Sequence, residues 1–158
     1  MNNQILNLVV VLIVTLIYLI ISIKVLNNFF FKLTKPLTNA SLLLYSAVLF
    51  GFGLTLFQFM GVATNALYFY ASNGSIITGL WFWVMFAFFA LGFSYGVFLF
   101  TFYFVGLLTQ ENEKAELAKN NYYIAALHSV VFILICLMVA KPLADLANSM
   151  VSYPKFPN

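Results

Sequence analysis

Charged residues are scarce in this chain of 158 residues: they make up 7% of it, and all seven basic side chains are lysines. Soluble globular domains carry about a quarter charged residues, so this scarcity excludes that class. Hydrophobic residues make up 64% of the chain instead, 19% of the residues are aromatic, and the mean hydropathy is +1.02. The composition therefore predicts an integral membrane protein whose solvent is the lipid bilayer.

Cysteine and histidine occur once each, as Cys136 and His128. A single cysteine cannot form an intrachain disulfide, and a single histidine excludes a haem with two histidine ligands from one chain. The sequence also lacks a Cys-x-x-Cys motif, a glycine-rich phosphate loop, a pair of intramembrane carboxylates and a serine beside a base. No cysteine or acidic residue stands at zinc-ligand spacing from His128. We therefore expect no enzyme activity, no catalytic residues, no metal site and no cofactor.

Most of the chain consists of four long apolar runs, at 5–26, 41–69, 77–108 and 122–146. A hydrocarbon core roughly 30 Å thick takes about 20 residues of helix to cross, and each run is at least that long. None of the runs alternates with a period of two, which favours helices over barrel strands. We expect an all-α membrane protein with a single domain over 1–158, in which four transmembrane helices form two helical hairpins of the same orientation.

The lysines predict how the chain lies in the membrane. Five of them flank or lie within the polar breaks 27–40 and 109–121, namely Lys24, Lys32, Lys35, Lys114 and Lys119. The opposite side carries only Lys141 and Lys155. By the positive-inside rule both breaks are cytoplasmic, and both termini lie on the outer side. Lysines spread in this way form no basic face, so we expect no nucleic-acid partner.

A weak internal repeat relates the two halves of the chain. The segments 39–50 and 121–132 match at three places: Asn39 with Asn121, Val48 with Val130, and Phe50 with Phe132. Both segments follow a polar break and open the second helix of a hairpin. This placement favours a duplication of 1–70 as 77–148, with both copies in the same orientation.

Residues around these asparagines resemble a known family. Asn39 is followed by Ala40 and Ser41; Glu116 and Leu117 precede Asn121, and Ala125 and Ala126 follow it. Here the chain is similar to the DUF350 (UPF0719) family, whose members have an Asn-x-Ala type motif in each of two hairpin repeats and a Glu-Leu before the later copy. The resemblance covers about 50 residues. It implies a four-span protein of the bacterial inner membrane, with Asn39, Asn121 and Glu116 as motif residues, and it implies no particular activity.

Two strongly polar side chains lie within the spans. His128 is about two turns into the fourth run, where a charged and unpaired group costs several kcal/mol, so it should be neutral, hydrogen-bonded or beside a cavity. It is either a proton relay or a histidine bonded to a neighbouring helix, and the second role is the commoner one. Gln58, in the second run, is either a bond between helices or a substrate contact.

Small residues at helical spacing indicate where helices approach one another. They are Ala47, Gly51 and Thr55 in the second run and Gly92 and Gly96 in the third. Small residues four apart let backbones come close, so this pattern predicts a pairing of the second and third spans. The break 109–121 contains the pairs Glu111 with Lys114 and Glu116 with Lys119, which favour a short surface helix.

These observations favour a structural or accessory subunit that assembles with copies of itself or with a larger membrane complex. Two alternatives stay open. One is an oligomeric ion channel or transporter, which would need a pore at an oligomer axis or a cavity at His128 and Gln58. The other is an accessory subunit of a redox complex that binds no cofactor itself.

Overall fold

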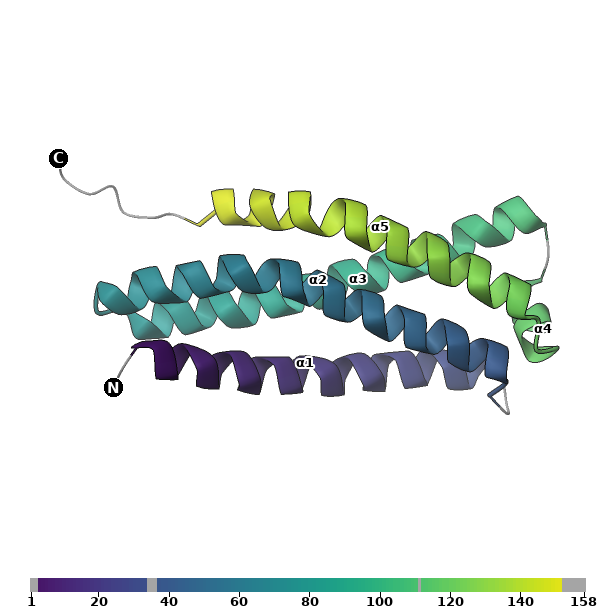
Figure 1. Ribbon diagram of the computed structural model, residues 1–158, viewed down its shortest axis with the longest axis horizontal. Coiled ribbons are helices and arrows are strands. Elements are labelled where there is room, and N and C mark those ends of the chain that lie inside the picture. Colours follow the sequence, from purple (N-terminus) through teal and green to yellow (C-terminus); the bar gives the residue numbers. More distant parts are fainter. Residues whose placement is uncertain (1–2, 34–36, 111, 152–158) are drawn as a thin grey trace.

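The computed structural model describes residues 3–33, 37–110 and 112–151 (Figure 1). Its helices are α1 (Asn3–Leu33), α2 (Asn39–Ser72), α3 (Ile76–Thr109), α4 (Glu113–Ala118) and α5 (Tyr122–Ser149). Four of them, α1, α2, α3 and α5, are long and apolar enough to cross a membrane. The prediction of an all-α protein with four long apolar helices is therefore confirmed.

The long helices alternate in direction and lie lengthwise beside one another (Figure 1). α1 begins and α5 ends at the end of the bundle that holds the turn between α2 and α3. The opposite end holds the last turn of α1, the first turn of α2 and the short helix α4. We call these the turn end and the lysine-bearing end, since Lys32, Lys114 and Lys119 lie at the second. Lys35, Glu111 and Lys155 lie outside the described residues.

Helix α2 is the centre of the bundle and contacts every other helix, most extensively α3 and α5. The reason lies in its sequence, where large apolar side chains recur at helical spacing and are buried: Leu44, Val48, Phe52, Leu56 and Phe59. In the most apolar stretch of α2, 44% of the residues are buried, against 17% in α1. α1 is therefore a peripheral helix that leaves most of its surface to lipid.

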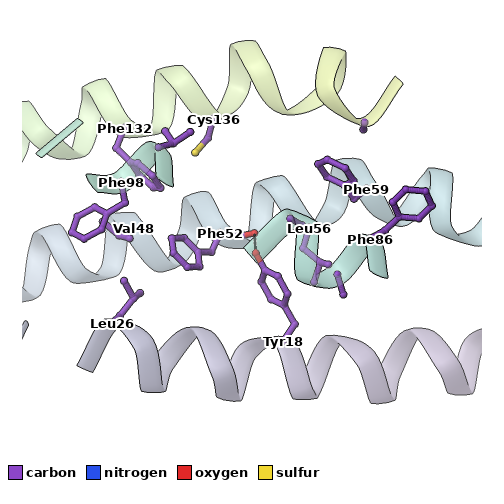
Figure 2. Close-up of a cluster of buried hydrophobic side chains, with 14 of the residues drawn as sticks. Tyr18, Leu26, Val48, Phe52, Leu56, Phe59, Phe86, Phe98, Phe132 and Cys136 are labelled. Atoms are coloured by element: carbon purple, nitrogen blue, oxygen red, sulfur yellow. Dashed lines mark hydrogen bonds between the residues drawn. The ribbon is translucent and has the colours of Figure 1, made fainter. Parts of the chain in front are cut away.

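Aromatic side chains fill the middle of the bundle (Figure 2). The Phe98 and Phe132 rings meet edge to face with centroids 6.1 Å apart, and Phe52 packs against Phe132 at 6.4 Å. α1 joins this core through Tyr18, whose hydroxyl donates a 3.0 Å hydrogen bond to the carbonyl of Phe52 (Figure 2). The edge-to-face arrangement of Phe98 and Phe132 is favoured by the quadrupoles of the two rings.

The glycines pack differently from the sequence prediction. α2 and α3 do pack together, but Gly92 and Gly96 face outward, and no described atom lies within 4 Å of where their Cβ would be. The close approach of α2 and α3 is instead at Gly79, whose Cβ would lie 2.9 Å from the Cα of Leu67. Gly92 and Gly96 do not make the predicted close approach of α2 to α3, because both positions are exposed and neither Cβ would meet another helix.

In α2 the small residues face α5 rather than α3. A Cβ on Gly51 would collide with the ring of Phe132, so this glycine makes room for the central aromatic contact. Thr55 is fully buried and its hydroxyl donates to the Gly51 carbonyl at 3.0 Å, while Ala47 is half-buried. Sequence reasoning therefore found a real packing surface on α2 and assigned it to the wrong neighbour.

The two asparagines of the repeat have different roles. Asn121 is the N-cap of α5, and its side chain accepts a hydrogen bond from the backbone of Tyr123 at 3.0 Å. At the start of α2 the cap is Thr38, and Asn39 is an exposed first residue of the helix. Likewise, Phe50 is 59% exposed whereas its match Phe132 is fully buried. The aligned residues are not in equivalent environments, and the duplication stays a prediction.

Candidate functional site: a buried glutamate and histidine

His128 lies in the second turn of α5 and is 1% exposed. Its ring nitrogen Nδ1 is 2.9 Å from the carbonyl oxygen of Ile124, one turn earlier in the same helix. A carbonyl only accepts hydrogen bonds, so Nδ1 carries the proton and donates it. This bond fixes the tautomer, and Nε2 is the nitrogen left to face the rest of the bundle.

Glu113 is the first residue of α4 and is only 6% exposed, although α4 lies at the surface. Its side chain turns under α4, where the Thr109 hydroxyl donates to Oε1 at 2.6 Å. Gly106 leaves room for it, since a Cβ there would lie 3.2 Å from the Glu113 Cγ. Leu117, one turn later on the same face, is fully buried as well. The inner face of this six-residue helix is thus one carboxylate and one leucine.

The two buried side chains face each other. Nε2 of His128 and Oε2 of Glu113 are 3.6 Å apart, and neither atom has a hydrogen-bond partner in the described part of the chain. With the ring proton on Nδ1, a neutral imidazole would point the lone pair of Nε2 at a lone pair of the ionised carboxylate oxygen Oε2, and the two would repel. A proton on either atom turns this repulsion into attraction, although 3.6 Å is too long for a good hydrogen bond until the side chains shift slightly. The geometry is that of a site for one proton.

The site borders a hollow at the surface. Glu113 lines a hollow of about 520 Å³ at the lysine-bearing end, together with the polar residues Gln110, Asn112 and Lys114. On the inner side the ring of Phe102 lies with its centroid 5.1 Å from that of His128. One turn further along α5 comes the fully buried Phe132. The hollow at the lysine-bearing end therefore borders Glu113, and aromatic rings pack beside His128 further into the bundle.

Hydrogen bonds hold α4 against the start of α2. The Thr38 hydroxyl donates to the Leu117 carbonyl at 2.7 Å, and the backbone N–H of Ala40 donates to the Asn120 side chain at 2.9 Å. Asn120 has a φ of +63°, a left-handed conformation that asparagine tolerates better than most residues. These bonds connect the segment between α4 and α5 to the first turn of α2, so the site rests on two separate connections of the chain.

The outer side of α4 carries the charge pair that the sequence predicted. Glu116 Oε1 accepts from Lys119 at 2.7 Å, and Oε2 accepts from the Asn121 amide at 2.9 Å. The Lys119 ammonium first, and the Asn121 amide second, lower the pKa of the Glu116 carboxyl below its ordinary value. The predicted surface helix with a Glu116–Lys119 pair is confirmed. Glu111, and with it the predicted pair to Lys114, lies outside the described residues.

Gln58 is not part of this site. It is half-buried in α2, and none of the hydrogen bonds among the described residues involves it. It follows the start of α2 by 19 residues and His128 follows the start of α5 by 6, which separates them by about 20 Å along the bundle. Gln58 and His128 therefore do not belong to one site.

Glu113 is the residue that sequence reasoning missed. Of the three glutamates in the break 109–121, Glu111 and Glu116 each have a lysine three residues later, whereas Glu113 has Glu116 there and Leu117 next. A glutamate without a lysine partner, on the same helical face as a leucine, was a signal for burial. Within the described residues no three histidine, cysteine, aspartate or glutamate side chains are grouped so that they could hold a metal ion.

No family model, curated protein or solved structure matches this chain. The resemblance to the DUF350 family therefore stays a prediction. Any functional proposal rests on the geometry of the chain itself.

Proposed function

We propose that this protein is an accessory subunit of a membrane assembly, and that it binds a proton at Glu113 and His128 from the lysine-bearing side. The observation that carries the proposal is the 3.6 Å approach of two buried atoms, Glu113 Oε2 and His128 Nε2, that have no hydrogen-bond partner among the described residues. Glu113 lines an open hollow at the lysine-bearing end, and Phe102, which also lines the hollow, packs beside the His128 ring. We propose that this site binds and releases a proton without passing it across the bundle.

The polar groups deeper in the bundle support an accessory role over conduction by a single chain. The buried hydroxyls of Thr55, Ser94 and Ser129 each donate to a carbonyl four residues earlier in their own helix. These three hydroxyls are satisfied by the backbone of their own helices. An oligomeric channel or transporter would need a pore between chains, and a redox accessory role would need a partner that holds the cofactor.

The proposed setting follows from the lysines and the family resemblance. The lysine-bearing end would face the cytoplasm of a bacterial inner membrane, and both termini would face the periplasm. The exposed faces of α1 and α3 would meet lipid, copies of the same chain or larger membrane subunits. In this setting the Glu113–His128 pair would lie toward the cytoplasmic face, and we propose no catalysis.

Proton binding would act on α4. Glu113 connects α4 to the end of α3 through Thr109 and faces α5 through His128. Loss of the shared proton leaves lone pairs opposed in a buried site, which favours withdrawal of the carboxylate toward the open hollow. Because Glu113 is the first residue of α4, withdrawal of its side chain would loosen α4 from the bundle. A partner docked at this end would then sense the change.

The single histidine makes the proton site directly measurable. Protein labelled with ¹⁵N-histidine and reconstituted in lipid gives imidazole signals from His128 alone. We expect Nδ1 to be protonated throughout, and the Nε2 signal to respond to pH. In Glu113→Gln the acidic partner is lost, so the protonated fraction of Nε2 at a given acidic pH falls; in the control Glu116→Gln it does not. The proposal would be contradicted if Nδ1 carried no proton, or if the Nε2 signal of Glu113→Gln responded to pH in the same way as that of the native chain.

Two further measurements separate the accessory role from conduction. In proteoliposomes that contain a pH-sensitive dye, we expect no proton flux above that of protein-free vesicles; a flux that His128→Ala abolishes would favour the channel alternative instead. After cross-linking and mild extraction, we expect the chain in a homo-oligomer or with larger membrane subunits. Recovery as a monomer without partners would count against an assembly role.

A further inference from the structure

A furrow runs along the surface of the bundle between α1 and α3. One hollow of about 830 Å³ lies beside the stretch of α1 from Lys24 to Lys32. A second, of about 250 Å³, continues it toward the beginning of α1. Both hollows are lined by Phe88 and Leu91 of α3, so they adjoin one another. We call them together the α1–α3 furrow.

The part of the furrow nearer the lysine-bearing end is basic. Lys24, Asn28 and Lys32 are spaced by four residues and therefore line one face of α1, with about 12 Å along the axis between the two lysines. Neither lysine forms a salt bridge with an acidic residue in the described part of the chain. The facing wall is Gly92 and Tyr95 of α3. Two unpaired ammonium groups thus stand at one end of a concave surface.

The rest of the furrow is apolar. Its walls are side chains of Val14, Ile17 and Ile21 on α1 and of Val84 and Ala87 on α3. Tyr18 also lies here, but its hydroxyl is already bonded to the Phe52 carbonyl. The furrow therefore joins a cationic end to a hydrocarbon surface along one line that runs parallel to the helices.

We propose that the α1–α3 furrow binds an anionic phospholipid, with its phosphate between Lys24 and Lys32 and an acyl chain along the apolar part. Lys24 lies eight residues inward of Lys32, and an ammonium at such depth is costly unless it reaches water or an anion. A lipid phosphate at the membrane interface supplies that anion. Basic pockets between helices are the expected sites for anionic headgroups.

The same features disfavour other occupants. A hydrophobic helix of a partner would bury both lysines against an apolar surface without a counter-charge. Inorganic phosphate could meet the lysines but would leave the apolar part of the furrow empty. Only an amphipathic anion uses both parts, and the bilayer supplies such molecules at high local concentration.

Native mass spectrometry of the full-length protein, released from nanodiscs of defined lipid, tests the proposal. We expect a phosphatidylglycerol molecule to stay bound and phosphatidylcholine to be lost. The double variant Lys24→Gln/Lys32→Gln should weaken retention roughly thirtyfold, since each lysine near a membrane surface contributes about fivefold to anion binding. Lys141→Gln, which removes a lysine of α5 outside the furrow, is the charge control and should retain the lipid.

A steric variant tests the same site without changing charge. The Cβ of Gly92 would meet no described atom within 4 Å, so Gly92→Leu fills the hollow without straining the fold. Gly96 is equally open and lies one turn further along α3, outside the furrow lining. We expect Gly92→Leu to lose the lipid and Gly96→Leu to keep it, with the same helical circular dichroism in both.

Several outcomes would overturn the proposal. They are equal retention of phosphatidylcholine and phosphatidylglycerol, full retention in the lysine double variant, and full retention in Gly92→Leu. Displacement of the lipid by millimolar inorganic phosphate would point to a site for the anion alone. A protein partner cross-linked into the furrow from native membranes, in place of lipid, would also refute it.

Discussion

The two ends of the bundle are held together by different chemistry. At the turn end, α2 and α3 meet through Gly79 and Leu67, and the Tyr70 and Phe82 rings stack with their centroids 5.4 Å apart. At the lysine-bearing end, side-chain hydrogen bonds join α4 and the residue Asn120 to the start of α2, and the Glu113–His128 pair is buried nearby. Steric fit of this kind does not depend on protons, whereas a buried carboxylate and imidazole do. The comparison predicts that acid affects the lysine-bearing end more than the α2–α3 contact at the turn end.

The largest effect is expected from breaking the buried pair. His128→Leu leaves the Glu113 carboxylate buried beside only the Thr109 hydroxyl, and removing one partner of such a pair costs about 3 kcal/mol of unfolding free energy. Unfolding in mixed micelles with increasing dodecyl sulfate, followed by circular dichroism, measures it. Adding Glu113→Leu should recover part of the loss, because no unpaired polar group is then buried. Additive losses in the double variant would show that the two residues do not interact.

A somewhat smaller effect is expected at the turn end. Gly79→Val places a side chain against the backbone of Leu67, which cannot move aside without separating α2 from α3. Overpacking of this kind costs about 2 kcal/mol, and here the loss should be the same at every pH. The matched control is Gly61→Val, since no described atom lies within 4 Å of that position. An equal loss in both variants would mean that helix propensity, and not the contact, is responsible.

The two asparagines of the sequence repeat provide a third comparison. Asn121→Ala removes the N-cap of α5 and should cost about 1 kcal/mol in the same micelle assay. Asn39→Ala should have almost no effect, because Thr38 caps α2 and Asn39 is exposed. Equal losses at both positions would restore the equivalence that the sequence match indicated.

The smallest effect concerns Glu116 on the outside of α4. Its pKa is lowered by Lys119 and Asn121, so its contribution to stability is present above the ordinary value of 4.5 and is lost as the pH falls through the lowered pKa. Thermal unfolding between pH 6 and 3 should therefore fall slightly less steeply in Glu116→Gln than in the native chain. Because the side chain meets water, salt should reduce this difference. A difference that grows with salt would contradict the assignment.

The sequence was enough to predict the four spans but not their contacts. Hydropathy is a property of each run by itself, so α1, α2, α3 and α5 could be located without knowing their neighbours. Packing is different: Gly51 and Gly53 are two residues apart with similar surroundings, yet only Gly51 meets an aromatic ring. Glu113 shows the same limit, because its burial depends on where α4 lies against α5. The partner of His128 could be found only in three dimensions.

The bonds between α4 and the start of α2 also set an order of events during synthesis. They join residues that are 79 and 80 positions apart: Thr38 with Leu117, and Ala40 with Asn120. At about 5–20 residues per second, the first turn of α2 waits roughly 4–16 s after leaving the ribosome before its partners exist. The first hairpin must therefore enter the membrane with its contacts at the lysine-bearing end incomplete, and that end closes only when α5 follows. A chain that stalls before residue 120 would present that open turn to insertion factors and proteases.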